Sequence, residues 1–77
     1  MEEFIAYLVK NLVDQPDLVE VSIKEKEEGL WIEMKVDKKD IAKIVGRQGR
    51  TIKALRTLAI VIGARFGRRV RLDLIQE

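Results

Sequence analysis

Apolar residues in the first half of the chain change from a helical spacing to a strand spacing. Between residues 3 and 13 they recur every three or four positions, which predicts an amphipathic helix that ends before Pro16. Its apolar stripe would consist of Phe4, Ile5, Leu8, Val9 and Leu12. From Val19 to Val36 apolar and polar residues alternate, with one interruption at residues 26–29, Lys-Glu-Glu-Gly. Period-two alternation is typical of a strand with one buried face, so this segment predicts a β-hairpin.

The second half predicts two helices around a glycine-containing turn, and then a strand. Asp37 stands at the N-cap position of a short helix of about two turns, which stops at Gly46. A longer helix is expected from Arg50 to Phe66, and Gly67 is expected to end it. The core stripe of this helix would consist of Ile52, Leu55, Ala59, Ile62 and Phe66. Alternation over residues 70–74 predicts a last strand.

The predicted element order is αββααβ, an α+β fold in a single domain over residues 1–77. Two helices between two strands suit a crossover connection, so the second and third strands are expected to be parallel neighbours in a three-stranded mixed sheet. Each strand has only one apolar side, and the three helices are therefore expected on one face. A chain this short buries only about 60% of its unfolded surface, which favours self-association.

Charge is distributed unevenly along a chain whose net charge is only +2. Residues 1–37 carry ten acids and four bases, a net charge of −6. Residues 38–71 carry one acid and eleven bases, a net charge of +10, and residues 72–77 carry two acids. Polyanions respond to local fields more than to totals, and the basic stretch contains the glycine turn.

The residue types exclude several functions. The chain has no histidine, no cysteine and one serine, Ser22, so common nucleophile and base pairs cannot be assembled and no enzymatic activity is expected. No metal site and no cofactor are predicted. No apolar run approaches the ~20 residues of a membrane span, and the first residues are acidic. These features predict a cytoplasmic protein that is not bound to a membrane.

Residues 44–55, Ile-Val-Gly-Arg-Gln-Gly-Arg-Thr-Ile-Lys-Ala-Leu, carry the most specific motif. They resemble the hydrophobic-hydrophobic-G-x-x-G-x-x-I-x-x-hydrophobic signature of KH domains, and the αββααβ order resembles the type II KH arrangement over essentially the whole chain. Among these domains the chain is most similar to the small stand-alone bacterial KhpA (YlqC-like) family. This resemblance implies a single-stranded RNA-binding protein that acts as a post-transcriptional regulator or RNA chaperone. Many KH domains carry two basic residues between the glycines, whereas this chain has Arg47 and neutral Gln48.

The residues of this motif indicate how RNA would be held. Because Gly46 and Gly49 lack side chains, their backbone can approach a sugar-phosphate chain, and the amides that begin the next helix point toward it. The other polar residues expected at this site are Lys43, Arg47, Gln48, Arg50 and Lys53. By resemblance, Ile41, Ile44 and Val45 border a groove for about four nucleotides, although core packing is favoured as their main role.

A second apolar stripe on the long helix predicts a dimer. Ala54, Leu58 and Val61 centre more than about 90° from the core stripe, so one core cannot bury both stripes. A second copy of the chain is the symmetric partner. By resemblance, another KH-domain protein of the KhpB/Jag-like type could replace it.

Several alternatives stay open. Trp31 lies on the polar side of its strand, where it serves either as a platform for a base or, more favoured, as a protein contact. The basic group at residues 65–71 either extends the RNA path or pairs with nearby acids. A helix-turn-helix DNA reader is disfavoured by the apolar run from Leu58 to Ile62. The last alternative is a protein-interaction module with little RNA binding.

Overall fold

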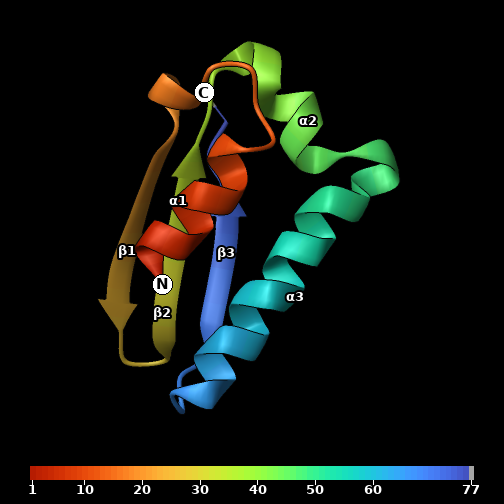
Figure 1. Ribbon diagram of the computed structural model, residues 1–77. Coiled ribbons are helices and arrows are strands. Elements are labelled where there is room, and N and C mark those ends of the chain that lie inside the picture. The colour runs from red at the N-terminus through yellow and green to blue at the C-terminus, as the bar shows by residue number, and fades with distance from the viewer. Residues whose placement is uncertain (77) are drawn as a thin grey trace.

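Helices and strands follow one another in the predicted order αββααβ in the computed structural model, which describes residues 1–76. Their bounds are Glu2–Lys10 for α1, Glu20–Lys26 for β1, Gly29–Lys35 for β2, Ile41–Val45 for α2, Arg50–Arg65 for α3 and Val70–Leu74 for β3. Short 3₁₀ turns precede β1, α2 and α3. All three helices lie on one side of the sheet, with α1 and α3 across its face and α2 at one end (Figure 1). The predicted α+β class and helix placement are confirmed.

The sheet is mixed, as expected, with strand order β1-β2-β3. β1 and β2 form an antiparallel hairpin around a two-residue turn, in which Lys26 lies opposite Gly29. β2 and β3 are parallel, with Leu30 opposite Val70 and Met34 opposite Leu74. β2 is therefore the central strand, and β3 is an edge strand beside α3.

The core fills the space between the sheet and the helices. Ile32 and Met34 of the central strand are fully buried. The other buried apolar residues are Ile5, Val9, Ile44, Ile52, Leu55, Ala59 and Leu72. Because side chains alternate along a strand, Trp31 and Glu33 point to the opposite face of the sheet, which no helix of residues 1–76 covers (Figure 1). One face of the sheet is thus core and the other is open.

The first helix is shorter than its apolar pattern predicted. It ends at Lys10, and the Asn11 side chain donates a hydrogen bond to the Tyr7 carbonyl at 2.7 Å. Beyond that point, backbone amides of the loop bind the side chain of Asp40 and draw the chain toward α2. Leu12 therefore lies outside the helix and is 40% exposed. The apolar periodicity predicted a helix as far as residue 13, but the hydrogen bonds to Asp40 take the chain in another direction after Asn11.

The predicted core stripe of α3 is buried at Ile52, Leu55 and Ala59 and only half-buried at Ile62, and it is wrong at its last member, Phe66. The helix ends at Arg65, and Phe66 is 75% exposed. The amides of Gly67 and Arg68 donate to the carbonyls of Ala64 and Gly63, at 3.1 and 2.9 Å, which is a Schellman ending. Gly67 has φ +69°, so it ends the helix as predicted. The reversal turns the chain toward β3 and leaves Phe66 outside the core.

Candidate nucleic-acid interface

Gly46 joins α2 to the glycine loop in a conformation that requires glycine. Its φ is 77° and its ψ 176°, a region that is essentially restricted to glycine. Its amide donates to the Ala42 carbonyl at 2.9 Å, and a Cβ at this position would collide with the side chain of Thr51. Gly46 therefore lets the end of α2 pack against the first turn of α3.

Gly49 also has a left-handed backbone, but its surroundings are different. Its φ is 75°, and a Cβ there would meet no atom within 4 Å beyond the adjacent residues. Gln48 shares the left-handed conformation, with φ 57°. The backbone of the loop thus faces open space on the side of Gly49, where a ligand can approach closely.

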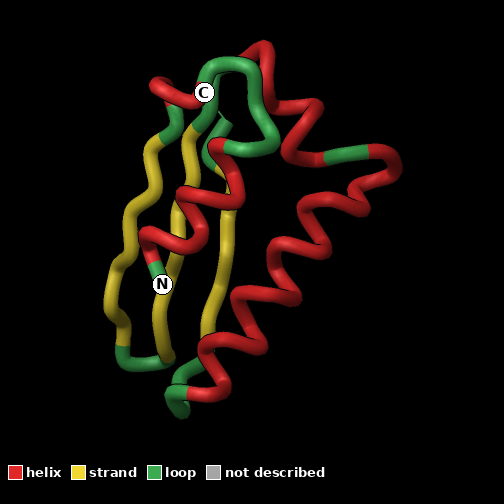
Figure 2. The backbone as a smooth tube through the Cα atoms, in the orientation of Figure 1, coloured by secondary structure: helices red, strands yellow, loops and turns green. Residues whose placement is uncertain are grey.

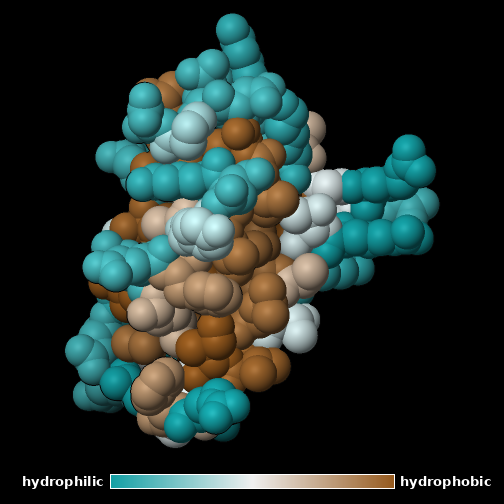
Figure 3. Space-filling view, in the orientation of Figure 1, coloured by the Kyte–Doolittle hydropathy of each residue, from teal (hydrophilic) through white to brown (hydrophobic). Residues whose placement is uncertain are grey.

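The loop carries exposed polar side chains. It lies farther from the sheet than either adjoining helix (Figure 2). Hydrophilic side chains project from the molecule at this place (Figure 3). Arg47 and Gln48 are exposed at the tip, and Arg50 Nη2 donates to Gln48 Oε1 at 3.0 Å. Lys53 follows on α3 and is also exposed. Together with the positive end of the α3 helix dipole, these groups form a positive surface suited to phosphate.

Lys43, expected at the rim of the loop, has partners within the protein. Its ammonium donates to Asp14 Oδ2 and lies 3.9 Å from Asp40 Oδ1. The hydrogen bond with Asp14 raises the pKa of Lys43 above the usual 10.5. The structure therefore connects this cation to the segment between α1 and β1.

Asp40 is a structural residue that the sequence patterns did not reveal. It is only 1% exposed, and its two carboxylate oxygens accept from the amides of Asp14 and Gln15 at 3.1 and 3.0 Å. Asp37 is a cap, but of the 3₁₀ turn Lys38–Asp40 that precedes α2 and not of α2 itself, since its side chain accepts from the Lys39 amide at 3.2 Å. Asp40 is the one acid of the basic stretch from 38 to 71, a signal that could have marked it.

Arg56 was also missed, and it links α3 to the edge strand. Its Nε donates to the Leu72 carbonyl of β3 at 3.0 Å. A hollow of about 390 Å³ lies at this edge, lined by Arg56, Ile60, Val70, Arg71, Leu72 and Asp73. Arg50, Lys53 and Arg56 recur every three residues, a spacing that places them along one side of the helix. This basic row leads from the loop to the edge of the sheet.

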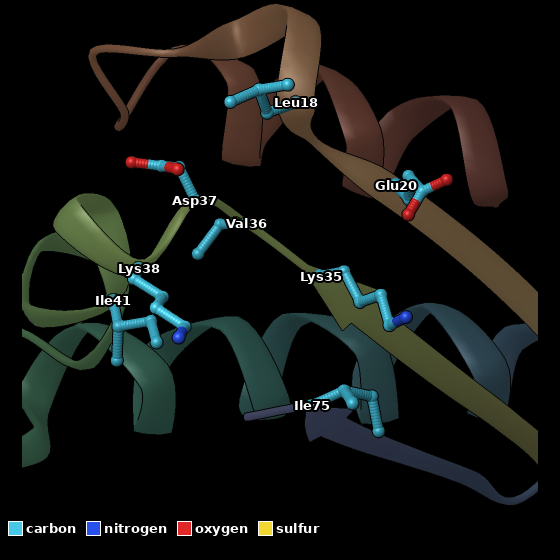
Figure 4. A pocket seen from close by; sticks show the side chains of 8 residues that line it. All are labelled: Leu18, Glu20, Lys35, Val36, Asp37, Lys38, Ile41 and Ile75. Carbon is cyan, nitrogen blue, oxygen red and sulfur yellow. The ribbon is translucent and has the colours of Figure 1, made fainter. Parts of the chain in front are cut away.

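The three aliphatic residues expected at the groove have different surroundings. Ile44 is fully buried and packs in the core, while Val45 is half-buried beside the loop. Ile41 lines a separate hollow of about 320 Å³ at the end of the sheet, with Val36 and Ile75 (Figure 4). That hollow shares no lining residue with the one at the edge of β3. Ile41 and Ile44 therefore do not lie on one surface.

The second apolar stripe of α3 lies on the surface. Ala54 is exposed, and Leu58 and Val61 are 44% and 54% exposed. Hydrophobic surface continues from this helix toward α1 (Figure 3). Apolar side chains that no part of residues 1–76 covers are typical of an interaction surface.

Residues 1–76 contain neither a membrane-spanning helix nor a cluster of metal ligands. None of their helices is both long enough and apolar enough to cross a membrane. Within the same residues, no group of three or more histidine, cysteine or acidic side chains could hold a metal ion.

Comparison with known proteins gives a consistent result. The family model described as KhpA/KhpB, KH domain matches residues 2–74. A protein of Chlamydia pneumoniae is 44% identical over 77 residues, covering 100% of this chain and 99% of the relative. One from Listeria monocytogenes is 38% identical over 76 residues, covering 99% and 100%. One from Streptomyces coelicolor is 45% identical over 75 residues, covering 97% and 91%. Each of these relatives is named RNA-binding protein KhpA.

Proposed function

The chain belongs to the KhpA/KhpB KH-domain family, and on this premise we propose that it binds single-stranded RNA through the loop Gly46–Gly49. The observation that carries the proposal is the open space at Gly49 between the exposed Arg47 and Arg50. A phosphate can approach the loop backbone there and meet two guanidinium groups, which are strong partners for phosphate oxygens. The names of the relatives support RNA as the ligand.

The bound strand follows the basic row of α3. Lys53 and Arg56 hold the next phosphates, and the bases turn toward Val45 and the edge of β3. This groove accommodates about four nucleotides. Lys43 acts indirectly, through an exposed ion pair with Asp14 that links α2 to the segment between α1 and β1.

Competition and salt dependence test this function. Labelled single-stranded RNA should be displaced by unlabelled RNA and not by duplex DNA. With about three phosphates neutralised, log affinity should fall against log salt with a slope near −2. Displacement by duplex DNA would favour the helix-turn-helix alternative, and a slope of zero would remove the basic row from the mechanism.

The working form is a dimer built on Ala54, Leu58 and Val61 of α3. Packing these exposed side chains against the same helix of a second copy removes them from water, and it offsets weak binding per domain through avidity. A second KH-domain protein of the KhpB/Jag-like type is the alternative partner. In the cell, such a dimer acts as a post-transcriptional regulator or RNA chaperone in the cytoplasm.

Light scattering tests the dimer. Leu58→Arg should give monomers, because a charge would be buried in an apolar interface. Ile60→Arg is the matched control, since Ile60 is an exposed aliphatic residue on another side of the same helix. A wild-type protein that is monomeric at high concentration, or equal effects of the two variants, would contradict this interface.

A further inference from the structure

Trp31 occupies the centre of the sheet face that the helices leave open. It is the one tryptophan of the chain and lies on the central strand β2, where it is half-buried. Its neighbours in register are Lys24 on β1 and Arg71 on β3. A large aromatic side chain outside the core and between two basic neighbours is unusual for an ordinary solvated face.

Two cationic side chains lie against the indole ring of Trp31. Lys26 Nζ lies 4.8 Å from the ring centroid, and the Arg71 guanidinium carbon lies 4.9 Å from it. At these distances each cation is attracted by the ring. Arg71 also pairs with Asp73 at 3.0 Å, whereas Lys26 and Arg69 form no ion pair within residues 1–76. Arg69 lines a hollow of about 160 Å³ beside Trp31, together with Arg71 and one acid, Glu28. The ring and its surroundings therefore offer both a stacking surface and positive charge.

This site is continuous with the edge of β3. Val70 and Arg71 line both the hollow beside Trp31 and the hollow in which Arg56 bridges to Leu72. A strand that leaves the loop along α3 reaches Arg56, then the edge of β3, and then the open face. Continuity with the proposed RNA groove favours one ligand for both surfaces.

We propose that an RNA longer than the segment held at the loop continues over β3 onto Trp31. The indole contacts a base, and Lys26, Arg69 and Arg71 contact the adjoining phosphates. Glu28 lines the same hollow on the side of the hairpin turn, so its carboxylate repels the RNA backbone there and keeps the phosphates on the side of Arg69 and Arg71. The inference rests on the proposed function, because the strand must first be held at the loop.

Tryptophan fluorescence reads this site directly, because Trp31 is the one indole in the protein. A short RNA of about four nucleotides fills the loop and should leave the emission unchanged. A long RNA of about ten nucleotides should quench the emission and bind more tightly. Equal affinities for the two RNAs with unchanged emission would overturn the inference and leave the proposed function intact. Failure of both RNAs to bind would overturn both.

Two variants distinguish RNA binding at the open face of the sheet from RNA binding at the loop. Arg69→Glu changes an exposed side chain, and it should weaken binding of the long RNA about tenfold without affecting the short one. Trp31→Ala should act in the same way and remove the fluorescence signal. Lys10→Glu, an equal charge reversal on α1, is the control and should affect neither RNA. If Arg69→Glu changed the oligomeric state and not the affinity for long RNA, the face would bind protein and the inference would be wrong.

Discussion

The two glycines of the loop have the same sign of φ but opposite surroundings. Gly46 is packed so closely against Thr51 that no side chain fits, whereas Gly49 faces open space. The residues next to these glycines show the same contrast between buried and exposed positions. Toward α2, Asp40 is buried and holds two backbone amides, while Arg47 and Gln48 at the tip are exposed. The loop thus has an anchored side that supports the fold and an open side that is available to a ligand.

Alanine substitutions at the two glycines should lower the free energy of unfolding by different amounts, and the larger of these losses is the largest effect expected. Gly46→Ala combines backbone strain with the Thr51 collision and should lower the free energy of unfolding by about 3 kcal/mol. Gly49→Ala introduces strain alone and should cost about 1 kcal/mol, yet its methyl group occupies the space that a phosphate would use. Urea denaturation and RNA titration of both variants check this. Equal stability losses would contradict the proposed division of the loop.

Removal of the buried Asp40 carboxylate should cause the next largest loss of stability. Asp40→Ala leaves the amides of Asp14 and Gln15 without their acceptor, which should cost about 2 kcal/mol of folding free energy. Asp40→Asn keeps one carbonyl acceptor and should lose less. Denaturant unfolding of the two variants measures the difference. A fully stable alanine variant would show that water replaces the carboxylate and that this anchor is dispensable.

Substitution of Lys43 should have the smallest effect on stability, because its ion pair with Asp14 is exposed and is screened by solvent. Its pKa is raised in the folded protein, so its contribution to stability is present below the usual 10.5 and is lost as pH rises through the raised value. Wild type should therefore be slightly more stable than Lys43→Met at neutral pH. The two should become equal in strongly alkaline solution, as measured by thermal unfolding of both proteins across this range. A difference that persists there would assign the effect to packing of the lysine stem.

The sheet and the order of the helices followed from local patterns. Alternation from Val19 to Val36 was sufficient for the hairpin, and the two helices between β2 and β3 were sufficient for the parallel pairing. Gly67 was predicted to end the long helix because it is a glycine directly after the last residue of the apolar stripe. These features depend on residues that are close together in the sequence.

The features that the sequence did not reveal depend on distant residues. Asp40 accepts from amides 25 and 26 positions away, and Arg56 reaches a carbonyl 16 positions away. No periodicity encodes such contacts, because each requires two elements to be placed in space first. The exposure of Phe66 has a different cause, since local hydrogen bonds from the amides of Gly67 and Arg68 reverse the chain directly after it. Local patterns predicted the loop, but the three-dimensional structure is needed to show that its Gly46 side is packed and its Gly49 side is open.

The most direct test of RNA binding at the open side is the double substitution Arg47→Asp with Gln48→Asp. Both side chains are exposed at the tip and both glycines remain, so folding and dimer formation should be unchanged. Two carboxylates would face the RNA backbone in place of one guanidinium, and binding should be lost. Lys10→Asp with Gln76→Asp gives the same change in net charge away from the loop and should bind like wild type. Affinity is measured by RNA titration, with circular dichroism and light scattering on the same samples. Loss of binding in a folded loop variant is the predicted result, and wild-type affinity in that variant would contradict the account.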